Sequence, residues 1–267
     1  EVVTYILDLL AHIIQDLIMS DRTDMAELAL DQLNQFIAFA DEISRSITQI
    51  KLKRMAEAAK RARESIATDN IIEKLVSQFT EPDHVISSRA GKILSQFKRI
   101  ETVENLFKLF SSPDRTLRRR TLEVLISLGE PAKTAALRRI ENIRNTDVFP
   151  RDETGRLEDE KWYEIRNAME IIAQLGTEKE REKVLRLETD PDPRVRKEAL
   201  MLGIRINPEM AKLAALKHIT DDPEVAKTAI SIIGMLKDQE DLDLLFYHFQ
   251  RRPELREEII LSLIHIS

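Results

Sequence analysis

The sequence predicts an all-α solenoid, a stack of helical hairpins that occupies most of the chain. The main observation is a unit that recurs about every thirty residues, in which a turn is followed by an apolar residue at the start of a helical pattern. We take that apolar residue as the anchor of each unit; the anchors are Ile86, Leu117, Ile165, Val195, Val225 and Leu255. Their spacings are 31, 48, 30, 30 and 30 residues. Units that recur at such a period cannot each bury an apolar face alone, so neighbours must stack.

Two further regularities support helices in these units. The residue four positions after each anchor is small or apolar, and one helical turn separates the two, so both are expected to face inward. These residues are Ala90, Thr121, Met169, Ala199, Ala229 and Ile259. A proline precedes most anchors, where it can end one helix or open the next; the prolines are Pro82, Pro113, Pro193, Pro223 and Pro253.

The composition agrees with a helical protein whose outer faces contact water. The 267 residues include only 6 Gly and 9 Pro, and 33% are charged against 43% hydrophobic. Cysteine is absent, which excludes disulfides and thiolate chemistry and is compatible with the cytoplasmic location that we expect. The chain begins without Met and ends within an apolar helical pattern, so we expect a fragment of a longer protein, in which a missing targeting signal says little.

Residues 1–66 differ from the rest and are predicted to form long N-terminal helices. No Pro occurs before Pro82 and no Gly before Gly91, and apolar residues follow one another in steps of three and four. The second series is Ala26, Ala29, Leu33, Phe36, Ala40, Ile43, Ile47 and Ile50. One interpretation is a helical hairpin that caps the first repeat, and the other is a coiled-coil or homodimer contact. We expect no membrane span, because polar side chains interrupt the first apolar stretch, namely Asp8, His12, Gln15 and Asp16.

Three segments carry the repeat pattern most clearly and resemble HEAT repeats. They are Pro193-Arg-Val-Arg-Lys-Glu-Ala199-Leu, Pro223-Glu-Val-Ala-Lys-Thr-Ala229-Ile and Ser112-Pro-Asp-Arg-Thr-Leu-Arg-Arg-Arg-Thr121-Leu. The period of thirty is similar to the short bacterial type found in phycobilin lyase subunits. The resemblance covers roughly residues 69–266 and implies a right-handed solenoid of about six helix pairs within residues 67–267. It implies architecture rather than activity, because repeat scaffolds host many unrelated functions.

Charge is distributed unevenly along the chain. Residues 1–50 hold 9 acidic against 2 basic residues, residues 51–66 hold 6 basic against 2 acidic, and residues 67–150 hold 14 basic against 11 acidic. A basic middle in a chain of net charge −6 can attract phosphate groups or an acidic protein. At 100° per residue, Arg115 and Arg119 point away from the buried stripe of their helix, so Arg118 and Arg120 do not join them in one patch. The resemblance places the second helix of each pair on the concave surface, where Arg115 and Arg119 could contact a partner.

The arginine that follows the anchor recurs at one repeat position, as Arg118, Arg166, Arg196 and Arg256. Repetition at one position favours a structural role over recognition of a ligand. We expect these arginines to bridge neighbouring repeats through acids such as Asp114, Asp192 or Asp222.

The one long interruption of the period lies between Leu117 and Ile165, and its excess falls at residues 145–161. Pro150 and Gly155 predict a loop, in which Phe149 and Leu157 are isolated apolar residues. The loop is either a tolerated surface excursion or a segment that binds a partner or covers a groove, with Phe149 and Trp162 as anchors.

Motifs for catalysis or cofactor binding are missing from the sequence. None of the five histidines has a neighbour or spacing typical of a metal site, and no Gly-rich phosphate loop or Gly-x-Ser-x-Gly elbow occurs. We therefore expect no metal, cofactor or catalytic residue. A phycobilin lyase role, which only the resemblance suggests, would need a pigment-binding groove that the sequence does not locate.

The sequence therefore favours a non-enzymatic scaffold or regulatory domain that binds a protein partner on its concave surface. The candidate contact residues are Arg115, Arg119, Phe149, Trp162 and Tyr163. The alternative is a nucleic-acid-binding repeat protein that uses the basic middle. Against that alternative stand the net charge, a pI of about 5.6 and few aromatic residues for base stacking; a HEAT-like DNA glycosylase would need more than the adjacent Trp162 and Tyr163.

Overall fold

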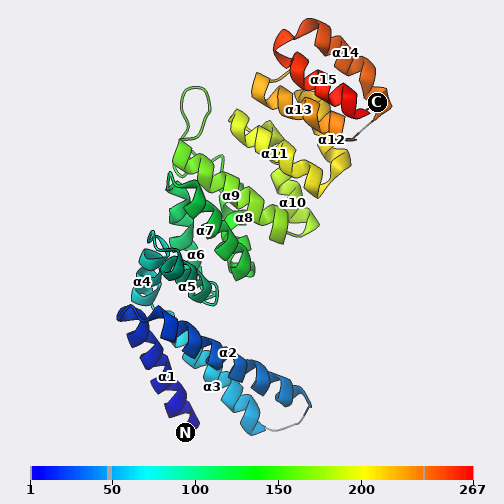
Figure 1. Cartoon of the computed structure of the whole chain (residues 1–267). Helices are drawn as coiled ribbons and strands as arrows, with labels where there is room; N and C mark the ends of the chain where they lie inside the picture. The colour runs from blue at the N-terminus through cyan, green and yellow to red at the C-terminus, as the bar shows by residue number, and fades with distance from the viewer. Residues whose placement is uncertain (1, 47–49, 237, 267) are drawn as a thin grey trace. The chain divides into compact units, whose positions relative to one another are not determined.

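The described part of the chain is helical apart from its connecting turns and a long loop within residues 143–158, which agrees with the predicted all-α solenoid. The structure, a computed structural model, describes residues 2–46, 50–236 and 238–266. In those ranges it contains fifteen α-helices and four short 3-10 helices, and the extended segments form one isolated antiparallel bridge, Arg151 to Leu157 (Figure 1). The chain divides into two compact units, Glu1–Ala132 and Lys133–Ser267. The fold class is confirmed, whereas the division at residue 66 stays a prediction.

The first unit begins with three helices, rather than the two of a hairpin, and continues with two helix pairs. Its helices are α1 (Val2–Met19), α2 (Thr23–Ser46), α3 (Ile50–Ile66), α4 (Asp69–Phe79), α5 (His84–Leu94), α6 (Ile100–Lys108), the 3-10 helix Leu109–Ser111 and α7 (Arg115–Leu128). Helix α1 packs against both α2 and α3. The predicted apolar series from Ala26 to Ile50 is thus divided between α2 and α3, and its member Ile47 lies outside the described residues.

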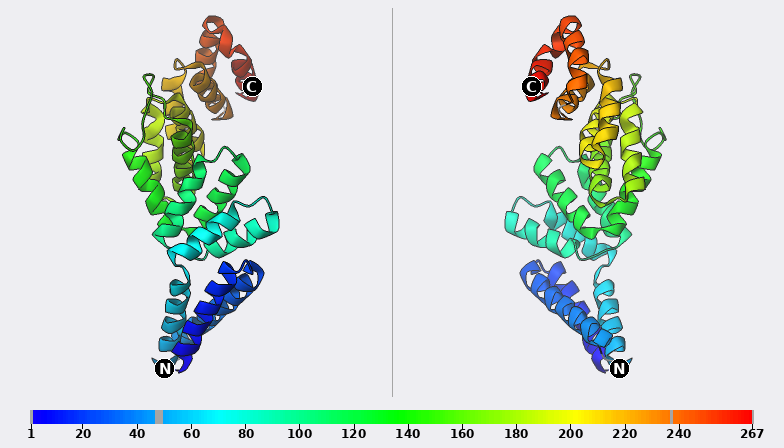
Figure 2. Two further views of the ribbon diagram at one scale, coloured as in Figure 1. Left: turned by 90° about the vertical axis from the view of Figure 1, so that its left-hand side faces the viewer. Right: turned by 90° about the vertical axis from the view of Figure 1, so that its right-hand side faces the viewer.

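The second unit is built from four helix pairs. Its α-helices are α8 (Glu130–Asn142), which starts at the boundary of the unit, α9 (Asp159–Leu175), α10 (Glu178–Leu185), α11 (Pro193–Ile206), α12 (Pro208–His218), α13 (Pro223–Leu236), α14 (Leu242–Arg251) and α15 (Arg256–Ile266). Its 3-10 helices are Arg186–Thr189, Gln239–Asp241 and Pro253–Leu255. The second helices of successive pairs, α9, α11, α13 and α15, pack side by side in that order (Figures 1 and 2).

The anchors and their partners one turn later form the core of these pairs. Five anchors are buried and Ile86 is half-buried, while all six residues four positions later are buried. Thr121, the polar member of that set, donates its hydroxyl hydrogen to the carbonyl of Leu117 at 2.8 Å. The buried hydroxyl is therefore satisfied within its own helix, so a threonine can replace a small apolar residue there.

Aspartates in the turns explain why the helices start where they do. The carboxylates of Asp83, Asp114 and Asp192 accept hydrogen bonds from backbone N–H groups in the first turns of α5, α7 and α11, respectively. Pro193 and Pro223 are the first residues of α11 and α13, where a proline costs no helical hydrogen bond. The turn residues thus fix where each of these helices begins, and with it the position of the anchor on the helix.

Helices α13 and α15 approach each other closely at Gly234 and Ser262. A Cβ atom added to Gly234 would lie 2.6 Å from the Cβ atom of Ser262. Ser262 is buried and donates its hydroxyl hydrogen to the carbonyl of Ile230 at 3.0 Å. Small residues at this crossing allow the two backbones to approach each other.

Helix α1 is apolar around most of its surface. By length and composition alone it could cross a membrane, although 22% of its residues are buried in the structure. The same test is met by core helices of soluble proteins, so it does not establish a span.

Candidate functional site

The four arginines of α7 have different environments. Arg115 is exposed, and the side chain of Arg119 is 81% exposed and pairs with Glu123 at 3.2 Å. Arg118 turns back to donate to the carbonyl of Ser112 at 2.6 Å. Arg120 lies 5.4 Å from the centre of the Phe79 ring and donates to the hydroxyl of Ser87. Arg115 and Arg119 are therefore accessible, as the sequence predicts, while Arg118 and Arg120 hold the first unit together.

Arg166 and Arg196 bridge neighbouring repeats, as expected, but they do so through other acids than those predicted. Arg166 pairs with Glu198 at 3.3 Å, and Arg196 makes two hydrogen bonds to Asp221 at 2.9 and 2.7 Å. Asp114, Asp192 and Asp222 instead accept hydrogen bonds from backbone N–H groups in their own turns. The predicted partners were wrong because a carboxylate next to a helix start is within reach of those N–H groups.

The loop between α8 and α9 packs against the rest of the second unit rather than extending into solvent. Phe149 is 1% exposed and Leu157 is 3% exposed. The guanidinium of Arg151 makes two hydrogen bonds to Asp190, at 2.8 and 2.9 Å, and a third to the carbonyl of Gly155 at 2.8 Å. Asp190 is itself 2% exposed, so this is a buried, bidentate ion pair.

A second buried carboxylate, Asp192, fixes the other end of the loop. It accepts hydrogen bonds from the backbone N–H groups of Leu157 at 2.9 Å and Arg194 at 2.8 Å. The guanidinium of Arg194 donates to the same carboxylate, pairs with Asp159 at 2.6 Å and lies 5.5 Å from the centre of the Trp162 ring. Trp162 therefore helps to hold Arg194 in place.

The predicted aromatic contact residues do not form an exposed pair. Phe149 is buried with the Lys161 ammonium 5.6 Å from its ring centre, and Trp162 and Tyr163 are half-buried. In this structure Phe149 is a core residue and not an accessible anchor. The acids that hold the loop were missed because they lie about 35 to 39 positions away, in the turn before α11. The feature of the sequence that could have pointed to these acids is the unusual segment Asp190-Pro-Asp192-Pro.

Acid should weaken the attachment of the loop through Asp192. Burial acts to raise the pKa of this carboxyl, but hydrogen bonds from Arg194 and from the backbone N–H groups of Leu157 and Arg194 outweigh it and lower the pKa below its ordinary value of 3.8. A carboxyl group whose pKa is lower in the folded than in the unfolded protein stabilises the fold. This contribution is fully present above the pKa of the unfolded state, and it is lost as the pH falls through the pKa of the folded state. We expect the difference in Tm between the wild type and Asp192→Asn to be constant from about pH 7 to 5 and to shrink below about pH 4. Thermal denaturation followed by circular dichroism checks this, and a constant difference down to pH 3 would contradict it.

The second helices of the last repeats carry an open hollow that we call the methionine groove. It has a volume of about 420 Å³ and is lined by Lys197, Met201, Ile204, Glu224, Lys227, Thr228, Ser231, Ile232, Met235 and Glu258. Met201 is 50% exposed and Met235 is 58% exposed, while Ile232 at the base is buried. At the charged end, Glu224 pairs with Lys197 at 3.2 Å and with Lys227 at 3.4 Å. The groove thus combines an apolar base with a rim whose charges are already balanced.

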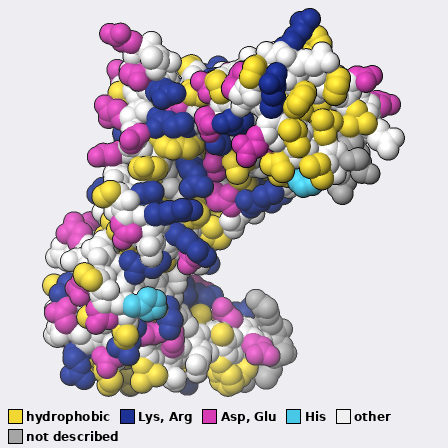
Figure 3. Space-filling view, turned by 45° about the horizontal axis from the view of Figure 1, so that its top comes forward, with side chains coloured by type: hydrophobic (Ala, Val, Ile, Leu, Met, Phe, Trp, Pro, Cys, Tyr) yellow, Lys and Arg dark blue, Asp and Glu magenta, His cyan; other side chains and the backbone are white. Residues whose placement is uncertain are grey.

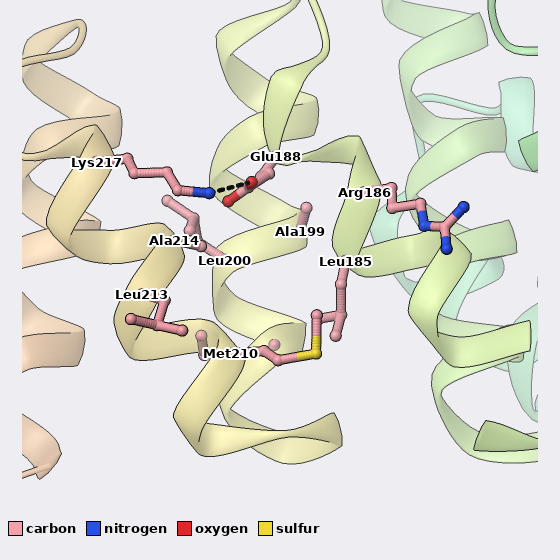
Figure 4. A pocket seen from close by; sticks show the side chains of 11 residues that line it. Leu185, Arg186, Glu188, Ala199, Leu200, Met210, Leu213, Ala214 and Lys217 are labelled. Atoms are coloured by element: carbon pink, nitrogen blue, oxygen red, sulfur yellow. Dashed lines mark hydrogen bonds and ion pairs between the residues drawn. The ribbon is translucent and has the colours of Figure 1, made fainter. Parts of the chain in front are cut away.

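A smaller slot lies on another face of α11 (Figure 4). Its volume is about 160 Å³, and its walls are mainly apolar, with Leu185, Leu200 and Met210 among them. Lys217 pairs with Glu188 at 3.5 Å across one end. The volume is below the several hundred Å³ typical of small-molecule sites, and it suits a single apolar side chain.

Apolar side chains also gather on the surface of the two C-terminal helices (Figure 3). The exposed members on α14 and α15 are Phe246, Tyr247, Ile260, Leu261 and Ile264. Among the described residues, no group of three or more His, Asp or Glu side chains could hold a metal ion. Of the two hollows described in the second unit, the methionine groove is the larger, and it combines apolar and charged lining residues.

Comparison with known proteins gives likenesses among solved structures. No protein-family model matches the sequence, and no curated protein matches it. Among solved structures, a chain from the complex of CpcE and CpcF of phycocyanin lyase from Nostoc sp. PCC7120 is similar at a TM-score of 0.33 and 14% sequence identity. The match covers 81% of this chain and 90% of that chain. A likeness at this level assigns no activity to this protein.

The comparison corrects the prediction that the protein is not an enzyme. The similar chain comes from a complex described as a phycocyanin lyase, and the absence of familiar motifs from this sequence does not exclude an enzymatic activity. The missing motifs were therefore not sufficient grounds for a non-enzymatic assignment. What the helices do establish is a helical repeat protein with accessible grooves.

Proposed function

We propose that this chain is a HEAT-like repeat protein that binds a helical segment of a protein partner in the methionine groove. The observation that carries the proposal is the pair of exposed methionines, Met201 on α11 and Met235 on α13, above the buried Ile232. Methionine is flexible and polarizable, and it is common on surfaces that adapt to apolar side chains of a partner. An amphipathic helix that lays its apolar face into such a groove is a frequent mode of peptide recognition.

The rim of the groove favours a partner of mixed charge. Glu224 lies between Lys197 and Lys227, so neither sign dominates that end. A strongly acidic or strongly basic ligand would have to displace these pairs, whereas an apolar stripe flanked by single charges would not. The groove therefore suits a protein helix better than a nucleic acid, whose phosphates need an excess of basic side chains.

The groove lies on second helices of the repeat pairs, where the resemblance to HEAT repeats leads us to expect partner contact. Lys197 and Lys227 stand two residues after their anchors, and Arg119 stands at the same position of its own repeat. The candidate Arg119 and the groove lysines are therefore equivalent in register. Basic residues recur at this position on the second helices of three pairs; Arg119 is exposed, and Lys197 and Lys227 are half-buried.

Site-specific photocrosslinking in cells tests the proposal. A photoreactive amino acid at position 201 or 235 is expected to capture a protein partner, while the same group at Leu213, which is 61% exposed on α12, is the matched control. The partner identified in this way should then bind purified Met235→Glu at least about tenfold more weakly than the wild type, because a charge enters an apolar contact.

Two outcomes would reject the proposal. One is equal capture from positions 201, 235 and 213. The other is tight binding of duplex DNA or single-stranded RNA in fluorescence anisotropy that is lost between about 50 and 200 mM salt, which would assign the protein to nucleic acid instead.

A further inference from the structure

Helix α1 presents apolar side chains on two opposite faces, of which the first unit covers one. Leu7, Ala11, Ile14 and Ile18 are buried against α2 and α3. On the opposite face, large apolar side chains recur with helical spacing and are 45 to 73% exposed; these are Val2, Tyr5, Ile6, Leu9 and Ile13. We call this second set the outer stripe. At 100° per residue its centre lies roughly 160° from the centre of the buried set.

A continuous stripe of this kind is unusual on a surface that remains in water. Single exposed apolar residues are common on proteins, but a contiguous row marks an interaction site. The stripe runs from Val2 to Ile13, which corresponds to about 17 Å of helix, so it offers about three turns to a partner helix. The side chains around the stripe indicate which kind of partner covers it.

The charges around the stripe identify the partner surface. Helix α1 contains Asp8 and Asp16 and no Lys or Arg. Beside its first turn lies a hollow of about 700 Å³, formed by Val3 and Thr4 together with α3. Basic side chains of α3 line this hollow and are exposed, namely Lys51, Lys53, Arg54 and Arg61. In contrast, Lys60 on the same helix pairs with Asp41 inside the unit at 3.0 Å.

We propose that the outer stripe binds a second copy of this chain, so that the protein is a two-fold symmetric dimer. In a two-fold interface each surface meets its own equivalent, so one α1 stripe packs on the other. The acidic α1 of each copy then lies next to the basic hollow on α3 of its partner. A second copy supplies both an apolar stripe of matching length and charges of opposite sign.

A membrane surface fits these residues less well. Helices that lie on membranes usually carry Lys or Arg on the polar face, which attracts anionic lipids. Both charged side chains of α1 itself are acidic and would be repelled by such lipids. The basic side chains that could attract these lipids belong to α3 and line the hollow beside the first turn, rather than the polar face of α1.

Sedimentation equilibrium of the whole chain from about 1 to 100 µM tests the dimer. We expect a reversible dimer for the wild type and at least about tenfold weaker association for Ile6→Glu, with unchanged helical content. The controls are Leu213→Glu on α12 and Ile264→Glu on α15, which also place a charge at an exposed apolar position and should leave the dimer intact. Raising the salt concentration should weaken association, because the paired charges are screened.

A charge exchange separates this arrangement from other dimers. Lys53→Glu with Arg54→Glu should weaken association, and adding Asp8→Lys with Asp16→Lys should restore part of it. The proposal is overturned by a monomeric wild type at 100 µM, or by a dimer that Ile264→Glu breaks and Ile6→Glu does not. It is also overturned if Ile6→Glu abolishes binding to vesicles of phosphatidylcholine and phosphatidylserine while the protein remains monomeric.

Discussion

Asp190→Ala will lower the free energy of unfolding by about 3 to 5 kcal/mol, because it leaves a buried guanidinium without its partner. Arg151 makes its bidentate contact to Asp190 with only 10% of its own side chain exposed and none of the aspartate's. The same carboxylate accepts a hydrogen bond from the backbone N–H of Asp192 at 2.9 Å, which is also lost. Urea denaturation followed by circular dichroism measures the change.

Two further variants separate the ion pair from a general effect on the loop. Glu153→Ala changes an exposed acid of the same loop and should alter the free energy of unfolding by less than about 0.5 kcal/mol. Replacing Arg151 and Asp190 together by leucine should recover much of the loss, since two apolar side chains leave no buried charge unpaired. Equal destabilisation by Asp190→Ala and Glu153→Ala would show that the buried pair does not hold the loop.

Phe149→Ala will destabilise the protein by about 3 to 5 kcal/mol, the range for removal of a buried aromatic side chain. The ring is 1% exposed, although it lies in a loop that the sequence offers as a partner-binding segment. Phe149→Leu keeps most of the apolar volume and should cost less, and Val148→Ala, at an adjacent position that is 45% exposed, should cost little.

The same variants distinguish a core residue from a binding anchor. If Phe149 belongs to the core, folded Phe149→Leu binds the partner captured at the methionine groove as tightly as the wild type does. If Phe149→Leu instead loses much of its affinity for the partner while its stability is unchanged, Phe149 contacts the partner. The loop would then have to open for the ring to become accessible.

The sequence predicts the position of the loop between α8 and α9 but not the contacts that hold it. Its position follows from the interrupted period between Leu117 and Ile165, and its turn residues Pro150 and Gly155 are visible in the sequence. Its attachment depends on Asp190 and Asp192, which belong to the turn of a different repeat. The segment Asp190-Pro-Asp192-Pro marks this turn as unusual, but acids are so abundant in this chain that nothing local shows that these two hold a loop rather than only cap a helix.

Helix α1 gives the complementary case. The sequence shows an apolar helix with few charges, and its periodicity indicates a seam. Only packing decides which of its two apolar faces is covered by α2 and α3 and which stays in solvent, because both faces have suitable residues. The outer stripe becomes visible once the buried set is known.

By itself the sequence determined the all-helical repeat architecture, the anchors and the turn residues, because helical periodicity and capping act over a few neighbouring positions. Tertiary structure alone decided that Phe149 is buried, that Arg196 pairs with Asp221 and that Met201 and Met235 line one groove. Those outcomes depend on side chains about 25 to 40 residues apart that are brought together by the stacking of repeats. A local pattern cannot specify which of many charged and apolar residues will meet across that distance, so the candidate site depends on the structure.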